Sequence, residues 1–294
     1  MDVFSPVKIN QAELVGVFQD GSEDWHKARS QGIGGSEIGA IMGLSPFSSA
    51  YRVWAVKTGR VKEEPVDNWA VKLGKAFEQP LLDLWAEQNP EYEVLITGTY
   101  RHKDYPWALA NLDALARHRE TGELIVLEVK TARNYWDDVP PHYIAQVQWY
   151  LWIMGIKRAR IVAVAGWDYR DIEITADEFE HEIMRATAER LWRCVEGDGE
   201  PDWDGSQVTY ETVRQLNPEI EDTECELGEL GVGLSNAHTI YTEALEEFNK
   251  YKSATLAAMG RAKFGIVTLE GYPPRTVAIR KARQGGTPWL EVRN

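Results

Sequence analysis

Apolar residues recur at helical spacing in several long stretches of this chain, and these stretches alternate with short, almost continuously apolar runs. The helical period of about 3.6 residues predicts helices over residues 22–29, 36–43, 47–60, 68–88, 143–154 and 177–195. Runs rich in β-branched and aromatic residues predict strands over residues 93–100, 107–116, 123–131, 159–166 and 168–175. Helices and strands are therefore expected throughout residues 22–195, and no internal repeat occurs.

The pattern changes beyond these elements. Residues 197–233 are acidic, rich in Gly, Asp and Pro and without a clear period, which indicates a linker or a loosely structured insertion. A helical period returns over residues 235–259, and two short apolar runs between residues 263 and 283 then predict a β-hairpin. We therefore expect a core domain over residues 1–204, followed over residues 205–294 by an acidic linker and a helical and β-hairpin extension.

Charge is distributed as unevenly as hydrophobicity. The formal net charge of −14 at pH 7 by itself argues against a nucleic-acid partner. Residues 196–231, however, carry twelve Asp and Glu against one Arg, whereas residues 260–294 carry seven Lys and Arg against two Glu. Most of the acidity therefore belongs to one segment, and the net charge does not exclude DNA binding.

The cysteine count and the apolar runs narrow the class of protein. No run of about 18 apolar residues predicts a membrane span, and residues 1–10 lack the basic and apolar regions of a signal peptide. The two cysteines, Cys194 and Cys225, lie far apart in the sequence, which fits a reducing compartment and excludes a four-cysteine zinc or iron–sulfur site. We therefore expect a cytoplasmic protein.

The strand predicted over residues 123–131 ends in charged residues. Glu128 and Lys130 are two positions apart, so their side chains point to the same face of the strand. One interpretation is a surface ion pair where the strand leaves the core. The other is a buried pair that serves a metal site, because buried charges are usually paired or bound to metal.

A second acidic residue favours the metal interpretation. Asp113 lies in the apolar strand predicted over residues 107–116, and antiparallel pairing could bring its carboxylate within about 5 Å of Glu128. Two close carboxylates repel unless a cation lies between them. Oxygen ligands favour Mg²⁺ or Mn²⁺ over zinc. The residues therefore predict metal-assisted hydrolysis of a phosphodiester, with Lys130 positioning water or stabilising charge on phosphorus.

Two other features remain open on sequence alone. The glycine-rich segment Gly32–Gly43 is neither a dinucleotide-binding fingerprint nor a P-loop. Its main-chain N–H groups suit a phosphate, but a tight turn with Ser36 as a helix N-cap explains it equally. Glu78, on the helix predicted over residues 68–88, is by itself consistent with a solvated carboxylate.

Taken together, these residues resemble a known family. The arrangement Asp113…Glu128-Val129-Lys130 is similar to the PD-(D/E)XK nuclease signature, and the surrounding motifs resemble those of YqaJ-type viral recombinases, the lambda-exonuclease-like group. The matching segments are Trp25-x₃-Arg29, Gly32–Ile38, Gly43–Phe47, Gly74-x₃-Glu78, Leu127–Thr131 and Ala145–Gln148. The usual proline is missing, since Leu112 precedes Asp113, and the resemblance does not extend beyond about residue 205.

The resemblance implies a fold and a set of roles. It implies an α/β protein of the α+β type with a restriction-endonuclease-like core, a central mixed sheet flanked by helices. It implies a Mg²⁺-dependent 5′→3′ double-strand DNA exonuclease that leaves 3′ overhangs, with Mn²⁺ as a substitute. The implied roles are metal binding by Asp113, Glu128 and the Val129 carbonyl, activation of water by Lys130, completion of the acidic site by Glu78, and binding of the 5′-phosphate by Arg29, Ser36 and Gln146.

The resemblance also implies partners. Double-stranded DNA ends are the expected substrate, a single-strand annealing protein is the expected partner, and a trimeric ring is the expected oligomer. A structure- or site-specific endonuclease on the same fold is one alternative. A non-catalytic DNA-end-binding scaffold is another, although the intact Asp113, Glu128 and Lys130 argue against it.

Overall fold

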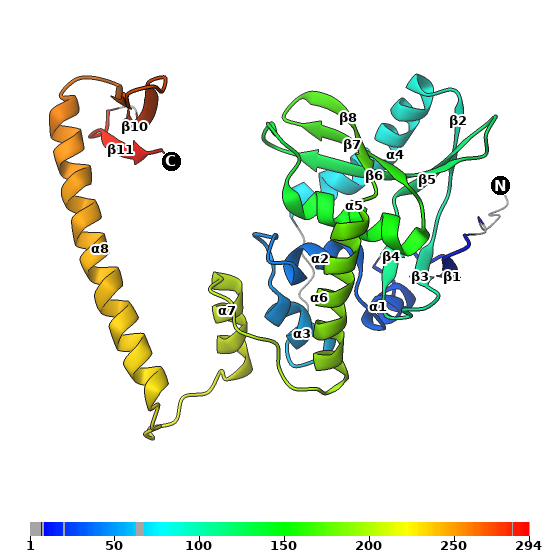
Figure 1. The fold of residues 1–294 in the computed structure, drawn as a ribbon, viewed down its shortest axis with the longest axis horizontal. Helices are drawn as coiled ribbons and strands as arrows, with labels where there is room; N and C mark the ends of the chain where they lie inside the picture. Colours follow the sequence, from blue (N-terminus) through cyan, green and yellow to red (C-terminus); the bar gives the residue numbers. More distant parts are fainter. Residues whose placement is uncertain (1–6, 8, 20, 63–67, 284, 294) are drawn as a thin grey trace. The chain divides into compact units, whose positions relative to one another are not determined.

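The computed structural model describes residues 7, 9–19, 21–62, 68–283 and 285–293, and it divides into two compact units, residues 1–220 and 221–294 (Figure 1). The predicted lack of a signal peptide concerns residues that lie mostly outside the described ones. The first unit contains the helices α1 (Glu23–Ser30), α2 (Gly35–Ile41), α3 (Ala50–Lys57), α4 (Trp69–Gln88), α5 (Pro141–Met154), α6 (Glu178–Glu196) and α7 (Gln207–Leu216). Its strands are β1 (Ala12–Gly16), β2 (Tyr92–Leu95), β3 (Thr99–His102), β4 (Leu109–Asn111), β5 (Ala114–His118), β6 (Leu124–Ala132), β7 (Arg158–Ala165) and β8 (Asp168–Thr175).

A five-stranded mixed sheet forms the centre of the first unit, in the order β2-β5-β6-β7-β8. Strands β6 and β7 are parallel, and the other neighbouring pairs are antiparallel. The chain crosses from β6 to β7 through α5, as a parallel pair requires. The observed architecture confirms the expected α/β fold with a central mixed sheet flanked by helices.

The two faces of this sheet are covered by different helices because side chains alternate along each strand. On one face, Leu127 and Val129 of β6 pack with Leu81, Leu82 and Trp85 of α4. On the other face, α5 lies across the sheet and packs in turn against α2 and α6. Glu128 and Lys130 belong to the face that α5 covers, since they alternate with the residues that face α4.

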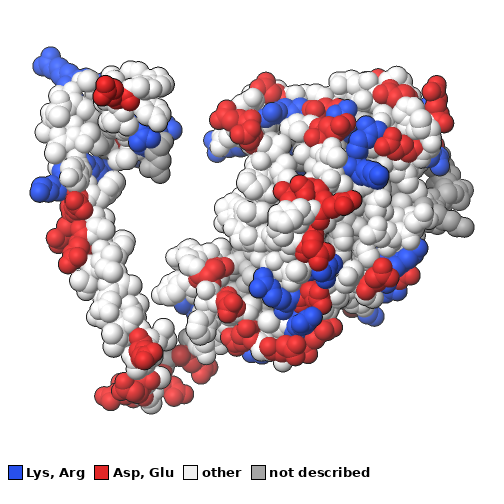
Figure 2. Space-filling model, in the orientation of Figure 1, with Lys and Arg blue, Asp and Glu red and all other residues white. Residues whose placement is uncertain are grey.

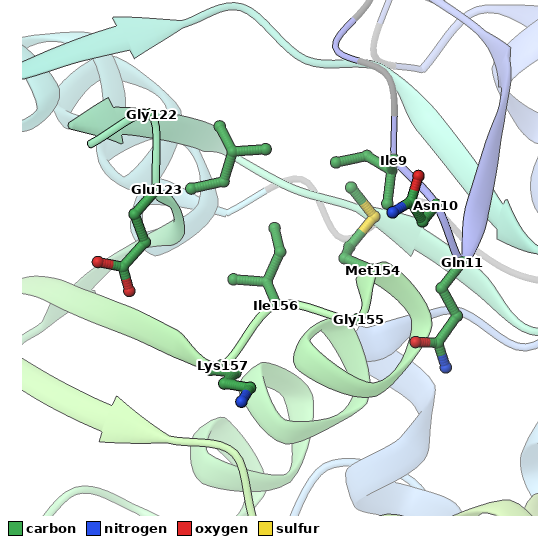
Figure 3. Close-up of a pocket in the computed structure, with 10 residues that line it drawn as sticks. Ile9, Asn10, Gln11, Gly122, Glu123, Met154, Gly155, Ile156 and Lys157 are labelled. Carbon is green, nitrogen blue, oxygen red and sulfur yellow. The ribbon is translucent and has the colours of Figure 1, made fainter. Parts of the chain in front are cut away.

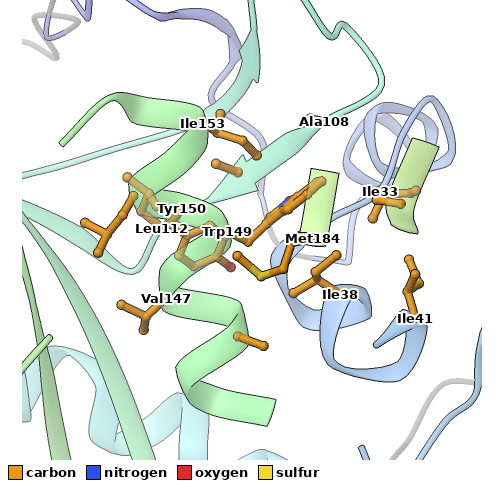
Figure 4. Packing of buried hydrophobic residues seen from close by; sticks show 14 of the residues in the cluster. Ile33, Ile38, Ile41, Ala108, Leu112, Val147, Trp149, Tyr150, Ile153 and Met184 are labelled. Carbon is orange, nitrogen blue, oxygen red and sulfur yellow. The ribbon is translucent and has the colours of Figure 1, made fainter. Parts of the chain in front are cut away.

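The larger core lies between this second face and the N-terminal helices. Trp149 of α5 is fully buried beside Ile38 of α2 and Met184 of α6 (Figure 4). The Trp149 indole N–H donates a hydrogen bond of 3.2 Å to the carbonyl oxygen of Leu109. This core therefore fixes α5 and α2 relative to β4, and all three elements border the candidate site.

The prediction of one strand over residues 107–116 is wrong in one respect, because the structure has two strands there that belong to different sheets. β4 joins the three-stranded sheet β1-β3-β4, whereas β5 joins the central sheet. Between them, the Leu112 carbonyl accepts a hydrogen bond from the Thr97 hydroxyl at 2.8 Å. The strand predicted over residues 93–100 is likewise divided, into β2 and β3.

The acidic segment is more ordered than its sequence predicts, because it contains α7. The hydroxyl of Ser206 caps α7 by accepting the Thr209 N–H at 3.1 Å. The buried Thr209 hydroxyl donates to Ser49 Oγ, at the start of α3, at 2.8 Å. The expectation of a linker or a loosely structured insertion is therefore wrong for residues 207–216, which belong to the first unit. The predicted boundary at residue 204 falls just before α7.

The second unit contains the long helix α8 (Glu229–Met259) and a small antiparallel sheet. This sheet has three strands, β9 (Phe264–Val267), β10 (Arg275–Lys281) and β11 (Trp289–Val292), in the order β11-β10-β9. The predicted hairpin corresponds to β9 and β10. The prediction omitted β11, which is only four residues long and follows a glycine-containing turn.

Charge separates along this second unit. Figure 2 shows Asp and Glu gathered near the start of α8, and Lys and Arg on the sheet that follows the helix. No helix among the described residues combines the length and the apolar character that a membrane span requires.

Candidate active site

The centre of the candidate site is formed where β5 begins beside β6. Ala114 pairs with Leu127 in the antiparallel ladder, which puts Asp113 opposite Glu128. The carboxylate of Asp113 accepts a hydrogen bond of 2.7 Å from the Val129 N–H. The predicted juxtaposition of Asp113 and Glu128 is therefore present, although Asp113 lies just before its strand and not within it.

Glu128 is buried, with a relative exposure of 1%. Its Oε1 accepts hydrogen bonds from Lys130 Nζ at 2.5 Å and from Gln146 Nε2 at 2.6 Å. Its Oε2 is also buried and has no hydrogen-bond partner among the described residues. The interpretation of Glu128 and Lys130 as a surface ion pair is therefore wrong, and one carboxylate oxygen remains available for another ligand.

Burial and mutual repulsion act on the protonation of these groups. Burial and the neighbouring Asp113 raise the pKa of Glu128 to about 8, against the opposing effect of Lys130. Burial also raises the pKa of Asp113, although Lys130 and the Val129 N–H oppose this shift. For Lys130, burial lowers the pKa, but the two carboxylates outweigh burial and the net pKa is raised. Lys130 therefore stays protonated, whereas ionisation of Asp113 and Glu128 at the same time is disfavoured.

The donor set fits a hard divalent cation. Among the described residues, no three His, Cys, Asp or Glu side chains are grouped closely enough to hold a metal ion. The fold offers instead two adjacent carboxylates, one with an unpaired buried oxygen, beside the main chain of Val129. A cation that shares the two carboxylates would relieve the repulsion that raises their pKa values.

Glu78 approaches the same centre from α4. Its side chain is partly buried, and its charge contributes to the raised pKa of Glu128. On the same helix, a Cβ at Gly74 would lie 3.5 Å from Thr131 Oγ1, so this part of α4 contacts the end of β6. The helix α4 therefore brings the charge of Glu78 within electrostatic range of Glu128.

Arg29 and Ser36 form a second polar cluster, between α1 and α2. Arg29 Nη2 donates to Ser36 Oγ at 3.1 Å, and the guanidinium lies 4.6 Å from the centre of the Trp25 ring. Ser36 is not the helix cap that the sequence suggested. Gly34 occupies that position, and its N–H donates to the Glu37 carboxylate at 2.7 Å. The hydroxyl of Ser36 therefore stays on the surface beside a cation.

Tyr150 connects the two clusters, and sequence reasoning missed it. A Cβ added at Gly35 would lie 2.3 Å from the Tyr150 ring, so the glycine permits this close contact between α2 and α5. The Tyr150 hydroxyl accepts a hydrogen bond of 3.0 Å from Gln146 Nε2. Burial, reinforced by Glu128 and Asp113, raises the pKa of Tyr150 well above its ordinary value, and Arg29 partly opposes the shift.

The Gln146 amide contacts both Glu128 and Tyr150. Its spacing of four residues from Tyr150 on one helix was the available signal for this pair. A further aromatic neighbour that the sequence did not indicate is Tyr143, whose ring lies 4.9 Å from Lys130 Nζ. Gln148 points elsewhere: it is buried and donates to the Thr175 carbonyl at 2.8 Å.

A separate pocket lies at the opposite end of β6 (Figure 3). It is lined by residues from the segment before β1, the turn before β6 and the end of α5, including Gln11, Leu124, Met154 and Lys157. None of the predicted site residues lines it. This pocket is therefore distinct from the paired carboxylates.

Comparisons with known proteins identify a family and a fold that this chain resembles. Residues 24–157 match the model of the YqaJ-like viral recombinase domain. Uncharacterized protein YqaJ of Bacillus subtilis (strain 168) is 30% identical over 218 residues, which cover 68% of this chain and 65% of that protein. The match thus spans just under two thirds of the relative's length.

Solved structures extend the likeness to the fold. An alkaline exonuclease (LHK-Exo) from Laribacter hongkongensis has a TM-score of 0.51 at 18% identity, over 60% of this chain and 94% of that chain. The same exonuclease in complex with dAMP gives a TM-score of 0.52 over the same shares at 18% identity. At this level of identity the likeness establishes the fold of the first unit.

Proposed function

Residues 24–157 match the YqaJ-like viral recombinase domain, and from that premise we propose that the chain is a divalent-metal-dependent deoxyribonuclease that degrades duplex DNA from its ends. The observation that carries the proposal is the buried pair Asp113 and Glu128, with one unpaired carboxylate oxygen and the ammonium of Lys130 beside it. Such an arrangement suits the hydrolysis of a phosphodiester, whose transition state gains negative charge.

Each residue of the centre has a role in this proposal. Asp113 and Glu128 would hold Mg²⁺, or Mn²⁺ as a substitute, with the Val129 carbonyl as a further ligand. When bound, the cation would supply Lewis-acid stabilisation of the phosphate and would acidify water. Lys130 stays protonated and would orient the attacking water. Glu78 would complete the acidic site from α4.

The second cluster supports recognition of a 5′ end. Arg29 and Ser36 offer a cation and a hydroxyl, which suit the additional charge of a terminal phosphate. Gln146 donates to Glu128 and to Tyr150, and the Tyr150 ring lies against Gly35, the neighbour of Ser36. A phosphate held at Ser36 would therefore be near the catalytic carboxylates. The helix α2 has only seven residues, so the proposal rests on these side chains and not on a helix dipole. Recognition of the 5′-phosphate would give 5′→3′ polarity and 3′ overhangs.

The test is degradation of linear duplex DNA with and without Mg²⁺. Three substrates are compared: ends with a 5′-phosphate, ends with a 5′-hydroxyl, and covalently closed circles. The proposal expects loss of linear DNA only with the metal, faster on the phosphorylated ends, and no reaction on circles. Nicking of circles would identify an endonuclease, and binding of ends without cleavage in any divalent metal would identify a scaffold.

Matched variants separate the two clusters. Glu128→Gln should abolish cleavage, whereas Glu120→Gln, at an exposed site in the turn between β5 and β6, should leave it unchanged. Arg29→Ala should remove the preference for phosphorylated ends, whereas Lys27→Ala, at an exposed site on the same helix, should keep it. An Arg29→Ala variant that still prefers phosphorylated ends would refute the phosphate site while leaving the metal site standing.

The partners remain predictions of the family resemblance. A trimeric ring would enclose the duplex and retain it despite the net charge of −14. A single-strand annealing protein would receive the 3′ overhang. Independently of the resemblance, the positive charge of the C-terminal sheet suggests that its basic residues would add contacts to phosphates.

A further inference from the structure

The helix α8 is unusual because none of its 31 residues is buried. Large apolar side chains nevertheless follow its length. Those that are exposed are Leu230, Val232, Leu234, Ile240, Tyr241, Leu245, Phe248 and Tyr251. The small sheet of the second unit partly covers only the last turns, at Thr255, Leu256 and Met259. A helix of this length, about 46 Å at 1.5 Å per residue, does not expose such a surface without a partner.

Four of these residues, Leu234, Tyr241, Phe248 and Tyr251, belong to a set of eight positions that alternate in steps of three and four over four heptads. This spacing is that of a coiled coil. The first position of each heptad is Leu234, Tyr241, Phe248 and Thr255. The fourth position is Ala237, Ala244, Tyr251 and Ala258. We call these eight residues the α8 seam.

The residues that flank the seam specify which helix it fits. The fifth and seventh positions of each heptad, called e and g, border the seam. In a parallel pair of helices in register, each g residue of one helix faces the e residue five positions further along the other helix. Glu247 at g would thus face Lys252 at e, and Ile240 at g would face Leu245 at e. Lys252 already leans toward the seam, with its ammonium 5.9 Å from the centre of the Phe248 ring.

These flanking residues are complementary to their own copies. In an antiparallel pair, g residues would face g residues and e residues would face e residues. Glu247, at g, and Lys252, at e, would then not contact each other. The outward positions carry polar residues, among them Thr239, Glu246 and Ser253. The seam is therefore a one-sided surface whose charge pattern matches a second copy in the same direction.

We propose that α8 joins copies of this protein through a parallel, in-register coiled coil along the α8 seam. The proposal does not rest on the nuclease function, because it concerns the second unit alone. Its consequence is that the first units of the associated copies are tethered to one another, which raises their effective concentration on one DNA molecule.

Disulfide trapping in the full chain tests the proposal. In a Cys194→Ser and Cys225→Ser background, Ala237→Cys and Tyr251→Cys are made separately and oxidised mildly. These seam positions lie 14 residues apart, about 21 Å along the helix, so each can pair with its own copy only if the helices are parallel and in register. The proposal expects a covalent dimer with each variant.

The controls are Thr239→Cys and Ser253→Cys, each two residues beyond a seam position and on the outward side of α8. They should remain monomeric on the denaturing gel. A dimer with only one of the two seam cysteines would indicate an antiparallel pair. No dimer with either one, together with slow alkylation of both, would indicate that another part of the chain covers the seam. Either result would overturn the proposal, and neither depends on nuclease activity.

A charge exchange provides a second, independent readout. Glu247→Lys and Lys252→Glu each place like charges opposite one another and should weaken self-association about tenfold, measured by sedimentation of α8-dependent oligomers. A mixture of the two variants restores opposite charges at both contacts and should recover the wild-type association. Equal weakening in the mixture and in the separate variants would contradict the parallel register.

Discussion

The raised pKa of Glu128 predicts that metal binding and proton release are linked. A carboxyl group must lose its proton before it binds Mg²⁺. With a pKa of about 8, the Glu128 carboxyl is ionised in only about a tenth of molecules at pH 7 and about a hundredth at pH 6. The apparent affinity for the metal should therefore rise about tenfold per pH unit from pH 6 to pH 8 and then level.

The raised pKa of Glu128 also determines whether the free energy of unfolding rises or falls with pH. The carboxyl has an ordinary pKa of 4.5 in the unfolded chain and a higher one in the folded protein. Between these values the folded state binds more protons, so the free energy of unfolding of the metal-free protein should fall as pH rises from about 4.5 to about 8. Added Mg²⁺ should oppose this fall most strongly near pH 8.

Isothermal titration of the DNA-free protein measures both quantities. Titrations of Mg²⁺ in buffers of different ionisation enthalpy count the protons released, and about one proton per cation is expected at pH 7. Glu128→Gln should remove the pH slope, whereas Glu120→Gln should preserve it. A wild-type affinity that does not change between pH 6 and pH 8, with no proton release, would refute the assignment of Glu128 as the titrating ligand.

Three further predictions concern packing, positioning and DNA affinity. Tyr150→Phe removes the hydroxyl that holds the Gln146 amide and should lower the turnover number about three- to tenfold while the thermal midpoint stays nearly unchanged; unchanged turnover would exclude a positioning role. Leu82→Ala, between α4 and the sheet, should lower the free energy of unfolding in urea by about 2–5 kcal/mol, and Leu84→Ala, at an exposed site on the same helix, should cost far less. Arg275→Ala, at an exposed site on β10 of the C-terminal sheet, should reduce the salt dependence of DNA binding by about one ion, and an unchanged slope would remove this residue from the DNA interface.

The pairing of Asp113 with Glu128 could be predicted because short-range features determine it. The two strands are consecutive, and the turn between them contains Gly122 with a φ of 72°, a conformation that favours glycine. A tight connection between antiparallel neighbours fixes their register. The two charges that end the apolar run of β6 then mark the site.

Other features depend on contacts that no local pattern reveals. Tyr150 has the same sequence appearance as any core aromatic residue of α5, and only the close approach of Gly35 shows that it links two polar clusters. The helix α7 is joined to the start of α3 by a hydrogen bond between Thr209 and Ser49, residues 160 positions apart. Where the chain leaves one sheet for the other, the Thr97 hydroxyl donates to the Leu112 carbonyl. These interactions are long-range, so composition and period could not predict them.

The passage of the chain from one sheet to another at Leu112 and Asp113 has a consequence for variation in length. The carboxylate of Asp113 is positioned by the path of the main chain, which leaves β4 and enters β5 within two residues. Inserting or deleting one residue here would rotate the carboxylate to the other face of the sheet, where α4 packs. Natural or engineered variants should therefore tolerate many substitutions around this connection but no change in its length.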